Sequence, residues 1–166
     1  MRRTILVLAA MAAALLLASG VALAVTKVGG PGDDVLTGTV RSDELYGRGG
    51  DDTLAGRKAS DALYGDAGAD ILYGDDGDDG LYGDAGADLL VGGEGEDTIY
   101  DGEDYGGPVD RLFGGAGNDT FYPYNQPAGK DFVYCGGGTD YVFADRADVL
   151  NDCERVTFGS GGGGYY

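Results

Sequence analysis

Hydrophobic residues recur at intervals of nine along most of the chain. From Gly29 to Tyr100 the sequence divides without a gap into eight nine-residue units, and the eighth place of every unit is Leu or Ile. Four further units follow two interruptions, at residues 101–104 and 123–125. Their eighth places are Leu112, Phe121, Val133 and Val142. One large apolar residue per unit predicts a three-residue strand whose central side chain faces inward and whose two neighbours face outward.

The six places that precede each strand have the composition of a tight turn. Gly fills place one in all eight uninterrupted units, place four in six of them and place two in two. Glycine there allows positive φ angles and a close approach of neighbouring backbones. Two units make one coil of 18 residues with strands on opposite sides, so residues 18 apart stack at the strand spacing of about 4.8 Å. The pattern predicts an all-β fold, a parallel β-roll (β-solenoid) over residues 29–143.

Place six is the most regular polar position, because it is aspartate in all twelve units. These residues are Asp34, Asp43, Asp52, Asp61, Asp70, Asp79, Asp88, Asp97, Asp110, Asp119, Asp131 and Asp140. Turn formation and a solvated acidic surface are one explanation, but turns also accept Asn or Ser. Neither residue occurs at place six, which favours the interpretation that these carboxylates bind metal.

Charge narrows the possible partners. The 166 residues include 11 basic and 29 acidic side chains and no histidine, for a net charge of −18. Such a chain repels nucleic acid and attracts cations, and it lacks the long apolar segments of a pore former. The absence of histidine excludes Ser-His-Asp and Cys-His catalysis and an H-E-x-x-H zinc site. We expect no enzyme; a carbohydrate-active enzyme that uses paired carboxylates is only a remote alternative.

Calcium is the cation that suits this donor set. Successive coils bring place-six carboxylates together, and without a counter-ion these repel one another. Ca²⁺ takes six to eight oxygen ligands at about 2.3–2.6 Å, whereas Mg²⁺ holds its water and transition metals prefer nitrogen or sulfur. Because the apolar core is thin, we expect several Ca²⁺ ions and a fold that depends on binding them.

The units resemble the nonapeptide G-G-x-G-x-D-x-U-x, with U a large apolar residue, of the hemolysin-type calcium-binding (RTX) repeat family. The resemblance implies that the place-six aspartates of two stacked turns share each ion, for example Asp34 with Asp52 and Asp43 with Asp61. Two units depart from the pattern: places two and four are Thr39 and Arg41 in one and Arg57 and Ala59 in the other. Sites on that row are expected to be weak or empty.

The first 24 residues have a different composition. Arg2 and Arg3 precede an apolar run at 5–17 and small residues that end at Ala24, which is the layout of a secretory signal peptide. The alternative is an uncleaved membrane anchor, although the run is short for a bilayer span. Cleavage after Ala24 predicts a secreted, extracellular chain with 9 basic and 29 acidic residues, a net charge of −20, and a lead-in at 25–28.

The C-terminal region departs from the nine-residue repeat. Cys135 and Cys153 lie one full coil apart in the sequence, which predicts a disulfide; two separate thiols are the alternative. Residues 144–158 resemble the closing segment of secreted calcium-binding repeat proteins and are expected to form a C-terminal cap. A further ion is possible at Asp145, Asp148, Asp152 and Glu154. The last residues, 159–166, are expected to be a flexible glycine-rich tail.

A row of tyrosines occupies place nine of every second unit. Tyr46, Tyr64, Tyr82 and Tyr100 follow one another at intervals of one coil and should stack on the outside of one sheet. Strand propensity explains such a row. The alternative is an adhesion module in which the row recognises a glycan or a second copy of the chain. The sequence therefore predicts a secreted calcium-binding repeat protein with a structural or binding role.

Overall fold

The computed structural model describes residues 23–102, 108–123 and 129–159, and this part of the chain consists of β-strands and turns. The strands are β1 (Thr26–Val28), β2 (Val35–Thr37), β3 (Glu44–Gly49), β4 (Thr53–Lys58), β5 (Ala62–Ala67), β6 (Ile71–Asp76), β7 (Gly80–Tyr82), β8 (Leu89–Glu94), β9 (Thr98–Tyr100), β10 (Arg111–Ala116), β11 (Thr120–Tyr122), β12 (Phe132–Gly137), β13 (Tyr141–Ala144), β14 (Val149–Asn151) and β15 (Arg155–Phe158). From β2 to β13, each strand begins at place seven of a unit.

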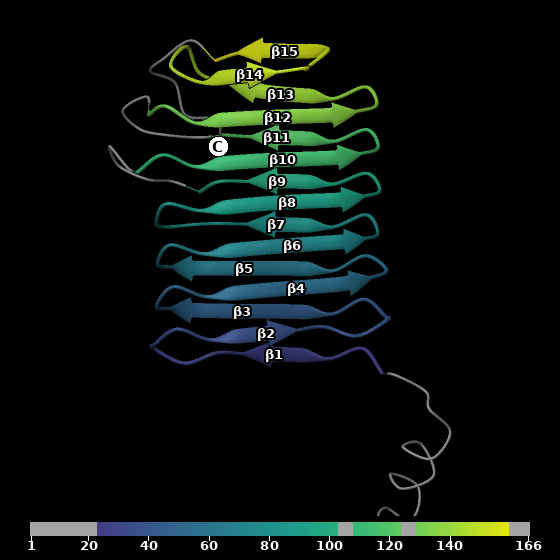
Figure 1. Cartoon of the computed structure of the whole chain (residues 1–166), viewed down its shortest axis with the longest axis vertical. Coiled ribbons are helices and arrows are strands. Elements are labelled where there is room, and N and C mark those ends of the chain that lie inside the picture. Colours follow the sequence, from purple (N-terminus) through teal and green to yellow (C-terminus); the bar gives the residue numbers. More distant parts are fainter. Residues whose placement is uncertain (1–22, 103–107, 124–128, 160–166) are drawn as a thin grey trace, which may run out of the picture.

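The strands form two parallel sheets that the chain visits in turn. One sheet has the order β1-β3-β5-β7-β9-β11-β13-β15, and the other has the order β14-β12-β10-β8-β6-β4-β2. In Figure 1 the strands rise in chain order from β1 to β15, and odd-numbered and even-numbered strands point in opposite directions. This arrangement confirms the predicted all-β, parallel β-roll.

The pairing register follows the repeat and its interruptions. Glu44 pairs with Ala62, and Ala62 pairs with Gly80, each two units further along the chain. Across the first interruption Leu89 pairs with Arg111, and across the second Arg111 pairs with Phe132. Each of these two steps exceeds a regular coil by the length of the inserted segment. The interruptions therefore lengthen turns and leave the stacking of the units intact.

Several strands are longer than the sequence predicted. β3, β4, β5, β6, β8, β10 and β12 each have six residues instead of three. They continue through places one to three of the next unit, where Arg48 pairs with Asp66 and Gly49 with Ala67. The left-handed residue at place two bends the strand without ending its pairing with the neighbouring coil.

The core is a double row of inward side chains between the two sheets. The eighth-place residues from Leu45 to Val142 are at most 1% exposed. Leu36, Leu150 and Val156 are partly buried and pack against the two ends of this row. The predicted thin core of eighth-place residues is confirmed.

Residues 144–158 form a last, irregular coil. Phe132 pairs with Val149 and Tyr141 pairs with Arg155, and both steps are shorter than a regular coil. A disulfide joins Cys135 to Cys153, with a Cα–Cα distance of 5.2 Å. The expected signal peptide lies outside the described residues except for Leu23 and Ala24, as does most of the expected tail. Among the described residues no helix is long and apolar enough to cross a membrane.

Candidate metal centre

The place-six aspartates line the inside of the turns on both sides of the roll. From Asp43 to Asp140 they are at most 5% exposed. From Asp52 onward, one oxygen of each carboxylate, Oδ1, accepts a hydrogen bond from the place-six N–H of the coil before it. Ten such bonds run from Asp34–Asp52 to Asp119–Asp140, at 2.6–2.9 Å. We call this series the inner ladder; it joins residues the sequence predicted as pairs.

The inner ladder continues beyond the repeat through two acidic residues of the C-terminal coil. Asp131 N–H donates to Asp148 Oδ1 at 3.2 Å, and Asp140 N–H donates to Glu154 Oε2 at 3.1 Å. These two carboxylates therefore take the positions that place-six aspartates hold in earlier coils. The sequence had grouped them only as candidates for a further ion.

The second carboxylate oxygen, Oδ2, has a different environment. Within the described part of the chain it is buried and accepts no hydrogen bond in a set of place-six residues from both sides of the roll: Asp52, Asp61, Asp70, Asp79, Asp97, Asp119 and Asp140. An ionised oxygen that is buried without a donor is costly unless a cation lies beside it. These atoms therefore mark positions where a positive charge is required.

Place one shows why glycine lies beside most of these oxygens; Asp140 is the exception, with Cys135 at place one of its unit. A Cβ built on Gly65 would lie 2.5 Å from Asp70 Oδ2 and 2.7 Å from the carbonyl oxygen of Gly83, one coil further on. The same pair of neighbours, a carboxylate oxygen and a place-one carbonyl oxygen, surrounds Gly47 and Gly92. Glycine therefore leaves each carboxylate open to oxygen donors from the next coil.

Places two and four adopt the left-handed conformation in the regular turns from Gly47 onward. Gly68 and Gly77 at place four have φ of 146° and 150°. Place two accepts larger residues, since Arg57 has φ of 90° and Asp66 has φ of 70°. The prediction of positive φ is thus confirmed for places two and four, whereas place one requires glycine only for close approach.

Burial raises the pKa of several place-six carboxyls from Asp61 onward. The pKa of Asp70 rises to about 6, chiefly by burial, with the carboxylates of Asp52, Asp51 and Asp66 adding to the rise. The pKa of Asp97 rises to about 7, again chiefly by burial and then by Asp119 and Asp79. In both residues the hydrogen bond from the backbone N–H opposes the rise. Without a cation, these groups resist ionisation near neutral pH.

The first interruption adds a carboxylate that the repeat does not contain. Asp101, Asp110 and Asp131 are each 1% exposed or less, and one oxygen of each lies within 4.8 Å of the others. Asp101 stands where a place-one glycine would otherwise start the next unit. From the sequence, residues 101–104 were expected only as an insertion in the repeat; the acidic residue at a place-one position was the signal for this additional carboxylate.

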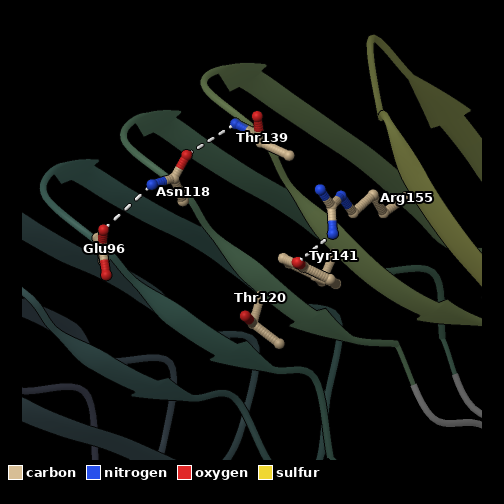
Figure 2. Close-up of a pocket in the computed structure, with 6 residues that line it drawn as sticks. All are labelled: Glu96, Asn118, Thr120, Thr139, Tyr141 and Arg155. Atoms are coloured by element: carbon tan, nitrogen blue, oxygen red, sulfur yellow. Dashed lines mark hydrogen bonds between the residues drawn. The ribbon is translucent and has the colours of Figure 1, made fainter.

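Side chains at place five form a second, outer series of hydrogen bonds. Asp33 Oδ1 accepts from Asp51 N–H at 3.0 Å, and Asp51 Oδ1 accepts from Ala69 N–H at 2.9 Å. Figure 2 shows the same feature on later coils, where Asn118 contacts Glu96 at 3.1 Å and accepts from Thr139 N–H at 2.9 Å. Side chains at place five therefore link successive coils through hydrogen bonds.

The tyrosine row stacks as predicted and is longer than predicted. Centroid distances of 4.5–5.0 Å and interplanar angles of 2–9° join Tyr46, Tyr64, Tyr82, Tyr100, Tyr122 and Phe143. Because these rings lie nearly parallel, each covers a face of its neighbour. The row therefore presents ring edges and hydroxyl groups to the outside, rather than ring faces.

Calcium fits the donor set of the turns. Carboxylate and carbonyl oxygens are the ligands that Ca²⁺ prefers, and buried Oδ2 atoms lie beside glycines that leave room for them. Nitrogen and sulfur donors are missing there, since the chain has no histidine and both cysteines are in the disulfide. The fold and the site define a parallel β-roll of the calcium-binding repeat class.

The sequence comparisons agree with this class. The model of the RTX calcium-binding nonapeptide repeat matches the chain in four copies, at residues 28–63, 58–90, 82–104 and 109–123. These copies cover more than half of the sequence, and the chain belongs to this family. Comparison with curated proteins gives no match.

Proposed function

We propose that this chain is a secreted, structural calcium-binding protein whose turns hold rows of Ca²⁺ ions between successive coils. The observation that carries the proposal is the set of buried Oδ2 atoms that accept no hydrogen bond in the described turns. The ligands are the place-six aspartates from Asp52 to Asp140, with carbonyl oxygens of neighbouring turns. When bound, Ca²⁺ supplies the positive charge that these carboxylates lack.

Folding of the roll is coupled to calcium in this proposal. The core is one residue wide in each sheet, and the chain after Ala24 has a net charge of −20. A cation that binds the folded turns and not the unfolded chain stabilises the fold increasingly as its concentration rises. The protein's activity is then to adopt a stiff, folded form where Ca²⁺ is abundant.

Secretion is supported by the leader-like residues 1–24 and by the disulfide, which persists in oxidising compartments. An exported chain that begins at Val25 is the expected product. N-terminal sequencing of protein recovered from the medium tests this part of the proposal independently of calcium binding, and a retained leader contradicts it.

The tyrosine row has a structural role in this proposal. Cross-strand aromatic stacking stabilises neighbouring strands, and the six rings span six successive coils. Recognition of a glycan by stacking requires free ring faces, and those faces are turned toward one another. The adhesion alternative, with a glycan or a second copy as partner, therefore has no supporting observation in the row.

The test is a calcium titration of the chain without its leader. In chelator we expect an expanded chain without a β-sheet signal in circular dichroism, and in millimolar Ca²⁺ a compact, sheet-rich one. Calorimetry should show heat of binding over the same range. Mg²⁺ at the same concentration is the control and should not replace Ca²⁺. A chain that folds fully in chelator at pH 8 contradicts the proposal.

A further inference from the structure

The first two turns of the roll differ in backbone conformation from all later regular turns. In turns 29–34 and 38–43, neither place two nor place four has a positive φ. Each complete regular turn from Gly47 onward that the structure describes has a left-handed residue at both places, such as Arg48 and Gly50 with φ of 81° and 105°. The difference begins at one point in the chain and does not recur.

This difference decides what the place-six carboxylate meets. In the first turn the N–H of Gly30 donates to Asp34 Oδ2 at 2.6 Å. In the second, the N–H of Thr39 donates to Asp43 Oδ2, and the Thr39 hydroxyl donates to Oδ1. The oxygen that accepts no hydrogen bond in Asp52 and later residues is therefore used by a backbone donor in the first two turns.

Asp43 shows most clearly that the chain itself satisfies this carboxylate. It is 3% exposed, and its Oδ1 accepts a further hydrogen bond from Val25 N–H at 2.6 Å. The three donors bring partial positive charges to both oxygens of Asp43, and such donors stabilise the ionised carboxylate in place of a metal. The carbonyl oxygen of Gly56 flanks Gly38 together with Asp43 Oδ2, as in later turns, so the difference is the N–H donor that already binds this carboxylate oxygen.

The charge distribution along the roll agrees with this difference. Residues 23–58 contain five basic and six acidic side chains, whereas residues 59–110 contain sixteen acidic and no basic ones. Lys58 forms an ion pair with Asp76 at 3.3 Å. The N-terminal part of the roll therefore carries almost no net charge, and its carboxylates repel one another less than those of the later coils.

Lys27 closes the same end of the roll. It pairs in register with Leu45, so it occupies the inward position that later strands fill with apolar residues. Its ammonium group donates to the carbonyl oxygen of Thr37, in the edge strand of the opposite sheet. An inward charge on an edge strand is a known way to end a sheet. The first coil therefore has its own terminal contacts.

We propose that the turns 29–34 and 38–43 take no calcium and form an N-terminal coil closed by the chain's own donors. The calcium rows then begin at Asp52 and Asp61, and the expected pairs Asp34–Asp52 and Asp43–Asp61 share no ion, because Oδ2 of Asp34 and of Asp43 accepts a backbone hydrogen bond. This inference rests on the proposed calcium-binding function. The sequence had predicted weak or empty calcium sites in both the unit with Thr39 and Arg41 and the unit with Arg57 and Ala59. Only the first of these is calcium-free in this proposal, because Arg57 and Ala59 adopt the left-handed conformation of the later turns.

Native mass spectrometry of the calcium-loaded chain without its leader tests the inference, because it counts bound ions. The double variant D34N/D43N should bind as many Ca²⁺ ions as the wild type. The matched variant D70N/D79N, which removes the same charge from later turns, should bind at least two fewer. Circular dichroism in saturating calcium checks that each variant is folded.

A second variant changes less of the early coil. D34N alone leaves Asp43 and its donors in place, and it should also bind as many Ca²⁺ ions as the wild type. Loss of an ion in folded D34N contradicts the inference even if D34N/D43N fails to fold. If folded D34N/D43N binds fewer ions than the wild type, the inference is wrong but the proposed calcium-binding function stands. A wild-type chain without bound calcium overturns the proposed function and the inference with it.

Discussion

The raised pKa values of the place-six carboxyls predict that acid replaces calcium in stabilising the roll. The perturbation is a change from pH 8 to pH 5 in calcium-free protein. Burial raises the pKa of Asp61, Asp70, Asp79 and Asp119 to about 6 and that of Asp97 to about 7, from an ordinary value of 3.8. The folded chain therefore holds more protons than the unfolded chain between about pH 4 and pH 7.

The sign and the magnitude follow from linkage. The contribution of these carboxyls to the free energy of unfolding is fully present below their pKa in the unfolded chain. It is lost as the pH rises through their pKa in the folded chain. A rise from 3.8 to about 6 in one buried carboxyl corresponds to about 3 kcal/mol. Neighbouring carboxyls influence one another and their contributions do not simply add, but a few such groups match the roughly 5–15 kcal/mol that stabilises a typical domain. Calcium-free protein should thus be unfolded at pH 8 and regain structure near pH 5.

The assay is urea unfolding of calcium-stripped protein between pH 4.5 and pH 8, followed by circular dichroism. The variant D97N removes the highest of these pKa values and keeps the Oδ1 acceptor, so it should be more stable than wild type at pH 8 and unchanged at pH 5. D33N, at the exposed place five of the first turn, is the matched control and should leave the profile unchanged, because Asp33 is not among the carboxylates that raise these pKa values.

Bound calcium reverses the expected dependence of stability on pH. Protons and Ca²⁺ compete for the same carboxylate oxygens, so stability in saturating calcium should rise with pH. Calcium-free protein that gains stability from pH 5 to pH 8 would refute the reasoning, because buried carboxyls without a cation cannot produce that trend. An unchanged profile in D97N would show that Asp97 is not one of the groups responsible.

Three further predictions concern the turns, the tyrosine row and the C-terminal coil. Gly77→Ala should prevent calcium-induced folding, because Gly77 has φ of 150° and a Cβ would overlap the backbone of the previous coil, whereas Gly32→Ala should be nearly neutral in thermal melts because nothing lies within 4 Å of that position. Tyr82→Ser removes two stacked contacts and should lower the free energy of unfolding by about 1–3 kcal/mol; a loss of self-association or surface binding with unchanged stability would contradict the structural role. Reduction of the Cys135–Cys153 disulfide should destabilise the C-terminal coil first, by about 2–4 kcal/mol, and hydrogen exchange that stays uniform along the chain would contradict this.

Much of the fold is determined by the sequence because the repeat is local. Each nine-residue unit contains its own turn signal, its own inward residue and its own aspartate, so counting places predicts both sheets and the stacking of place six. The insertions at 101–104 and 123–125 give the steps of 22 and 21 from Asp88 to Asp110 and from Asp110 to Asp131. No knowledge of distant contacts is needed for these conclusions.

The disulfide shows the limit of counting. The predicted Cys135–Cys153 disulfide is correct, but the reason for predicting it, a separation of one full coil, holds only approximately. In that region Tyr134 pairs with Asn151, one position short of a full coil, so Cys135 does not stand directly beside Cys153 in the register. The chain has left the nine-residue repeat by then, and the irregular coil sets the alignment through its own strand pairing.

The roles of individual oxygens were decided only by the tertiary structure. Asp43 and Asp61 have the same place in the repeat, yet donors surround both oxygens of Asp43 and leave Oδ2 of Asp61 without a hydrogen bond. The cause is the φ angle at places two and four, which Thr39 and Arg41 do not reveal, since Arg57 and Ala59 adopt the left-handed form. A hydrogen bond between coils depends on the conformation of both partners, and a repeat pattern describes only their spacing.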